Sequence, residues 1–133
     1  MSEQTKLAGP VSNPEIDPFW HAAREGKLLV KHCAACGKTH FYPRSICPFC
    51  FSSDTHWREA SGRGEVYSFT KIAMGSAEPY VLAYVKLEEG PAILTNIVRS
   101  DLIEIGRPVK LEFLETDSDP IPVFALAGPG EAA

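Results

Sequence analysis

Apolar and polar residues alternate along much of the second half of the chain, which is the pattern of half-buried β-strands. The clearest run lies at 79–88, where one face carries Val81, Ala83, Val85 and Leu87. Similar runs predict strands at 65–73, 91–98, 108–115 and 122–127. Five short strands, with a longer connection after the third, predict a small closed barrel. The OB-fold fits this count and order, and other five-stranded barrels fit nearly as well.

The first half has little alternation and one helical segment. The sequence predicts a helix over residues 18–25 that begins at the Asp17-Pro18 pair, with Asp17 as the N-cap. About two turns are too short to be stable alone, so its aromatic residues, Phe19 and Trp20, need to be buried. They either pack on the rest of this chain or anchor a partner protein.

All four cysteines lie between these two parts, as two C-x-x-C pairs: Cys33 with Cys36, and Cys47 with Cys50. Each C-x-x-C turn points two sulfurs at one spot, and two such turns facing each other form a tetrahedral thiolate cage. Short strands are expected on both sides of the first pair. The spacing therefore predicts a zinc ribbon with one structural ion, and a closed four-thiolate site has no open position for chemistry.

Other uses of the four thiols stay open at this point. Iron could occupy the same cage, although zinc is the default for two short knuckles. Two disulfides need an oxidising compartment, and residues 1–17 contain no apolar run like that of a signal peptide. A redox dithiol needs only one pair. We therefore expect a cytoplasmic protein.

Charge is distributed unevenly along the chain. Residues 1–58 carry seven Lys/Arg and five Asp/Glu, a net of +2, whereas residues 59–133 carry six and twelve, a net of −6. Because phosphate contacts supply most of the affinity for nucleic acid, the acidic half is a poor match for such a partner. Candidate stacking aromatics on the barrel (Tyr67, Phe69, Tyr84) nevertheless keep single-stranded nucleic-acid binding as an alternative function. No apolar run approaches the roughly 18 residues of a membrane span, so no membrane is expected.

The order of these features resembles the zinc-ribbon/OB-fold family of acyl-CoA-associated proteins, first catalogued as a domain of unknown function. The resemblance covers roughly residues 14–127, and the segments that carry it are Phe19-Trp20, the four cysteines, Phe41-Tyr42-Pro43-Arg44, Gly62 to Thr70, Pro79-Tyr80-Val81, Glu89-Gly90-Pro91 and Gly106-Arg107-Pro108-Val109. It implies a mainly β fold with a short N-terminal helix, a rubredoxin-like zinc ribbon and a five-stranded OB-fold barrel. We expect the tail and helix at 1–27, the ribbon at 28–60, the barrel at 61–128 and a second tail at 129–133.

The resemblance also implies a function, because members of this family accompany thiolase-like enzymes that condense acyl groups or cleave them in retro-Claisen and aldolase reactions. The chain is expected to be a non-catalytic scaffold subunit that helps to shape its partner's acyl-CoA channel. The expected assembly is a heterotetramer with acyl-CoA at or near the interface, and the catalytic residues are expected to be the partner's. Phe19, Trp20 and Arg63 are the candidates for contact with the partner or CoA. The sequence is consistent with a non-catalytic subunit, since the cage uses all four cysteines and leaves none to act as a nucleophile.

Overall fold

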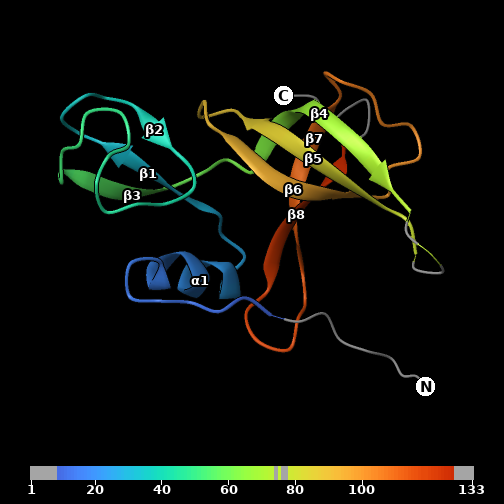
Figure 1. Ribbon diagram of the computed structural model, residues 1–133, viewed down its shortest axis with the longest axis horizontal. Coiled ribbons are helices and arrows are strands. Elements are labelled where there is room, and N and C mark those ends of the chain that lie inside the picture. Colours follow the sequence, from blue (N-terminus) through green and yellow to red (C-terminus); the bar gives the residue numbers. More distant parts are fainter. Residues whose placement is uncertain (1–8, 74, 76–77, 128–133) are drawn as a thin grey trace.

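The computed structural model describes residues 9–73, 75 and 78–127 (Figure 1). The tail expected at 129–133 and the first eight residues of the N-terminal tail lie outside these described residues. Within them the chain forms one helix and eight strands: α1 (Asp17–Arg24), β1 (Leu29–Cys33), β2 (Thr39–His40), β3 (Thr55–Glu59), β4 (Arg63–Ile72), β5 (Tyr80–Leu87), β6 (Ala92–Val98), β7 (Pro108–Leu114) and β8 (Ile121–Leu126). None of the described helical segments has the length and apolarity to cross a membrane.

Helix α1 begins and ends one residue earlier than predicted. The expected cap at Asp17 is wrong, because Asp17 is the first helical residue and the N-cap position belongs to Ile16. The Asp17 carboxylate instead accepts a hydrogen bond of 2.6 Å from Ser12 Oγ. Within the same segment, Asn13 Oδ1 accepts a hydrogen bond of 3.0 Å from the amide of Glu15. Two side-chain hydrogen bonds therefore stabilise the segment through which the chain enters the helix.

The ribbon is a three-stranded antiparallel sheet in the order β2-β1-β3. Strand β1 pairs with β3 along its whole length, from Leu29 opposite Glu59 to Cys33 opposite Thr55. Strand β2 is only two residues long, because Phe41 leaves the sheet and turns toward α1. Its ring centroid lies 5.7 Å from that of Phe19 on the helix.

The remaining strands form a closed barrel in the order β4-β5-β6-β8-β7, in which β4 also pairs with β7. All neighbours are antiparallel except β6 and β8. This is the strand order of an OB-fold, so the predicted architecture is confirmed. A register shift between Val66 and Ser68 marks a bulge in β4, the kind of irregularity that bends a strand. The alternation predicted in β5 is also confirmed, since its four inward residues are at most 5% exposed.

A single hydrophobic cluster of the described buried residues joins the ribbon to the barrel. Leu28 immediately precedes β1 of the ribbon and Val30 lies in it, and each is 1% exposed. Val66 and Phe124 of the barrel are fully buried in the same cluster. The C-terminal end of α1 lies close to the β7–β8 connection (Figure 1), and an ion pair between Arg24 and Asp119 joins the two segments. Ribbon, helix and barrel are therefore held in one arrangement by shared packing.

Candidate functional site

The two C-x-x-C pairs sit in turns that are closed by the same backbone hydrogen bonds. In each turn, the amide four residues after the first cysteine donates to that cysteine's carbonyl, at 2.8 Å for Cys33 and 2.9 Å for Cys47. The amide of each first cysteine also donates to the carbonyl five residues further on, at 2.9 Å in both turns. The closing residues are Gly37 and Phe51, with φ angles of 79° and 66°. The two halves of the ribbon are thus built as matching knuckles.

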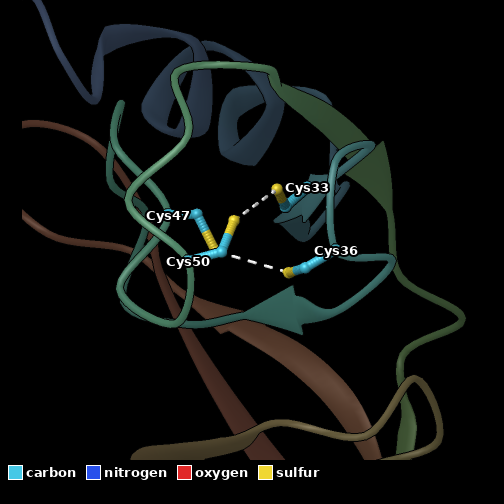
Figure 2. Close-up of side chains that lie close together, drawn as sticks. All are labelled: Cys33, Cys36, Cys47 and Cys50. Atoms are coloured by element: carbon cyan, nitrogen blue, oxygen red, sulfur yellow. Dashed lines mark hydrogen bonds between the residues drawn. The ribbon is translucent and has the colours of Figure 1, made fainter.

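The four sulfur atoms converge on one point between the knuckles (Figure 2). All four lie within 4.8 Å of one another. Cys33 Sγ is 3.6 Å from Cys50 Sγ, and Cys36 Sγ is 3.7 Å from Cys47 Sγ. A tetrahedron with metal–sulfur bonds of about 2.3 Å has edges of about 3.8 Å, so the cage has the dimensions of a structural zinc site.

The thiols of the second knuckle titrate very differently from one another. Burial raises the pKa of Cys47, but backbone hydrogen bonds from Cys50 and Phe49 outweigh this and bring the pKa down to about 7. A backbone hydrogen bond from Ser52 lowers the pKa of Cys50, but burial and the neighbouring thiols outweigh that bond and raise the pKa to about 12. At neutral pH the Cys50 thiol of this knuckle therefore keeps its proton until a metal ion replaces it. Metal binding should therefore release protons.

Phe19 and Trp20, the predicted contact residues on the helix, are buried by this chain itself. They are 3% and 8% exposed, and their rings meet edge to face at 4.7 Å. Their remaining surface lines a groove of about 450 Å³ where α1, the ribbon and the barrel meet. None of the described residues that line this groove is charged: Phe19, Trp20, Phe41, Tyr42, Tyr84, Ala92, Ile93, Leu94, Thr95, Asn96, Ile121 and Pro122. We call this feature the aromatic groove.

Arg63 lies in a different place, at the start of β4. Its guanidinium donates two hydrogen bonds to Glu88, of 3.2 and 3.3 Å, and the pair borders a second cavity of about 430 Å³. The hydrogen bond from Arg63 lowers the pKa of the Glu88 carboxyl. The adjacent Gly64 is required by packing, since a Cβ there would lie 2.5 Å from the carbonyl oxygen of Lys86. The structure thus brings the four cysteines together in the ribbon and places Arg63 on the barrel, paired with a carboxylate.

Exposed apolar residues on the second knuckle were missed by the sequence reasoning. Ile46, Phe49 and Phe51 are 48%, 54% and 77% exposed. The signal was nevertheless present, because the first knuckle reads C-A-A-C-G and the second reads C-P-F-C-F. Two phenylalanines stand in the second where alanine and glycine stand in the first.

Two protein-family models match adjoining parts of the chain. The "ChsH2, rubredoxin-like zinc ribbon domain" matches residues 20–56, and the "ChsH2, C-terminal OB-fold domain" matches residues 57–114. Among solved structures, a chain described as "Ltp2-ChsH2(DUF35) aldolase" superposes with a TM-score of 0.77 at 38% sequence identity. The match covers 90% of this chain and 100% of that chain.

Relatives of known name align over both parts of the chain. The probable enoyl-CoA hydratase alpha subunit of Thermomonospora curvata is 42% identical over 122 residues, 85% of this chain but only 38% of its own length. A DUF35 domain-containing scaffold protein of Methanothermobacter thermautotrophicus is 35% identical over 101 residues, 70% of this chain and 76% of its own. The benzoylsuccinyl-CoA thiolase subunit BbsA of Thauera aromatica is 32% identical over 108 residues, 73% and 74% of the two chains.

The family model of the ribbon, together with four sulfurs at tetrahedral spacing, fits one structural zinc ion. The order of helix, ribbon and barrel matches the resemblance drawn from the sequence. The chain belongs to the DUF35 family, and in it a ChsH2-type rubredoxin-like zinc ribbon is joined to an OB-fold domain.

Proposed function

We propose that this chain is a non-catalytic scaffold subunit of an acyl-CoA-processing complex, and that its partner is a thiolase-like enzyme. The observation that carries the proposal is the match to the Ltp2-ChsH2(DUF35) aldolase chain, which is covered over its whole length. The names of other relatives support the same class of assembly, since they include a scaffold protein and a thiolase subunit. We further propose a heterotetramer with two copies of each subunit.

In this proposal, Cys33, Cys36, Cys47 and Cys50 bind one zinc ion that holds the ribbon in shape. The sulfur spacing supports this assignment, and iron is the other metal that suits the same donors. Every cysteine of the chain is then used, so a cysteine nucleophile of the kind that thiolase-like chemistry needs belongs to the partner. The role of the metal is to hold the knuckles and the strands that follow them in place.

We propose that the aromatic groove forms this chain's share of the acyl-CoA channel. Its volume of about 450 Å³ and its uncharged aromatic lining suit the acyl part of the substrate. The same lining does not suit the phosphates of CoA, which need cationic donors. Arg63 is the candidate for that end of the molecule, and it would exchange its bond to Glu88 for one to a phosphate. Trp20 lines the groove and Phe19 supports it from the helix.

Reconstitution of the complex tests the proposal. The chain is purified with an affinity tag from the cells that produce it, and the proteins that accompany it are identified by mass spectrometry. A thiolase-like enzyme is expected among them, and its acyl-CoA turnover is expected to be lost when it is prepared without this chain. If the chain instead purifies alone and binds single-stranded DNA or RNA at physiological salt, the nucleic-acid alternative replaces this function.

A further inference from the structure

The second knuckle carries a patch of apolar side chains that the knuckle itself does not require. We call Ile46, Phe49 and Phe51 the knuckle patch. The first knuckle forms the same turn and the same two backbone hydrogen bonds with Ala35 and Gly37 at the positions of the two phenylalanines. Alanine and glycine are therefore sufficient to build a metal-binding turn of this geometry.

Phe51 is held in a backbone conformation that is unfavourable for its side chain. Its φ angle of 66° lies in the left-handed region, which bulky residues adopt only at a free-energy cost. Gly37 occupies the same position in the first knuckle with a φ angle of 79° and no steric penalty. A strained residue that persists in a fold points to a function of its side chain, since the strain itself contributes nothing to stability.

Burial within this chain does not compensate for that strain. Phe51 is 77% exposed, Phe49 is 54% exposed and Ile46 is 48% exposed, and none of the three belongs to the hydrophobic cluster that joins ribbon and barrel. The exposed ammonium of Lys38 lies over the Phe49 ring, 5.0 Å from the ring centroid. The patch therefore presents apolar surface to the outside with a positive charge at its edge.

We propose that the knuckle patch is a docking surface for the partner enzyme, and that it inserts into an apolar depression bordered by a carboxylate. This inference rests on the proposed function, in which such an enzyme is the partner. Large aromatic side chains anchor interfaces by filling pockets on the other protein. The exposed ammonium of Lys38 favours an acidic group at the rim of that pocket. The structural zinc site then has a second purpose, because it holds in place the knuckle that carries the patch.

The test compares variants that remove the phenylalanine without disturbing the turn. Phe51→Gly gives the second knuckle the residue type of the first, and Phe51→Asn keeps a side chain that tolerates a positive φ angle. Leu102→Ala is the matched control, since Leu102 is 73% exposed and lies on the connection between β6 and β7. Zinc content, melting temperature and affinity for the purified partner enzyme are measured for each variant.

Both Phe51 variants are expected to keep one zinc ion and to bind the enzyme about tenfold or more weakly than the wild type. Phe51→Gly is also expected to melt at the wild-type temperature or above it, because glycine relieves the strain. Leu102→Ala is expected to bind as the wild type does. A structural role for Phe51 predicts the opposite pattern, in which the melting temperature falls and affinity for the enzyme stays the same.

Each other outcome has a separate meaning. If the wild type binds the enzyme and the Phe51 variants bind it equally well, the knuckle patch is not the docking surface, while the proposed function stands. If the wild type forms dimers that Phe51→Gly abolishes without changing enzyme affinity, the patch is a contact between copies of this chain and the inference is overturned. If the wild type binds no acyl-CoA enzyme, the proposed function fails and this inference fails with it.

Discussion

Replacing Cys47 with serine tests whether the metal centre holds the fold together. The Cys47 side chain is fully buried, and its sulfur lies 3.7 Å from that of Cys36. Its pKa of about 7 makes it a thiol that is readily available to a metal as thiolate near neutral pH. A serine hydroxyl stays protonated at neutral pH and is a poorer ligand for zinc, so the variant retains only three thiolates.

Loss of one thiolate is expected to lower first the affinity for zinc and then the stability of the fold. Structural zinc contributes about 10–16 kcal/mol in small zinc-binding domains, so four equal ligands are worth about 2.5–4 kcal/mol each and zinc affinity falls roughly 10²- to 10³-fold. If the ribbon then opens, Leu28 and Val30 leave the cluster that they share with the barrel. Exposure of two such side chains costs about 3–6 kcal/mol, a large part of the 5–15 kcal/mol that stabilises a typical domain. Loss of zinc should therefore destabilise the whole chain.

The assay measures zinc per chain by elemental analysis and the melting temperature by circular dichroism. Cys47→Ser is expected to lose its zinc to a moderate chelator that leaves the wild type intact, and to melt at a clearly lower temperature. Ala35→Ser is the matched control, since it places a serine on the exposed side of the other knuckle without removing a ligand. A Cys47→Ser variant with one equivalent of zinc and the wild-type melting temperature would show that the fold does not depend on this ligand.

Three further predictions concern the barrel and the ribbon sheet. Gly64→Ala is expected to lower the free energy of unfolding by about 1–3 kcal/mol, because its Cβ meets the carbonyl of Lys86 at 2.5 Å; an unchanged denaturation midpoint would contradict this. Burial lowers the pKa of His40 below its unfolded value of about 6.5. The free energy of unfolding is therefore unaffected by His40 protonation above that pH, and it decreases as the pH falls from about 6.5 toward the folded pKa, because the unfolded chain takes up the proton first. The wild type should therefore lose more melting temperature between pH 7.5 and 5.5 than His40→Gln, and equal losses would show that His40 does not contribute. Arg63→Ala removes an exposed pair with Glu88, so the melting temperature should stay close to that of the wild type while acyl-CoA or partner binding weakens. Unchanged binding would mean that Arg63 contacts neither CoA nor the partner.

Much of the fold could be predicted from local patterns. The barrel strands were located to within about two residues because their apolar residues alternate, as in β5, where every second side chain from Val81 to Leu87 points inward. The cysteines were found from their spacing alone, because each C-x-x-C turn builds half of a tetrahedral site without help from the rest of the chain.

Features that depend on contacts between distant segments could not be predicted. Strand β2 ends at His40, and the next residue, Phe41, packs on Phe19, 22 residues before it in the sequence. The aromatic groove needs side chains from α1, the ribbon and the barrel at once. The partner of Arg63 is Glu88, 25 residues further along the chain. The residues of the knuckle patch were visible in the sequence, but their exposure follows only from the packing.

Native mass spectrometry of the chain purified from its own cells tests the scaffold function and the metal site together, because one spectrum reports bound metal, partner and stoichiometry. We expect one zinc ion per copy of this chain, in a complex that contains two copies of it and two of a thiolase-like enzyme. A zinc-bearing monomer with no acyl-CoA enzyme would contradict the scaffold function. A metal-free chain in complex with the enzyme would contradict the role assigned to the four cysteines.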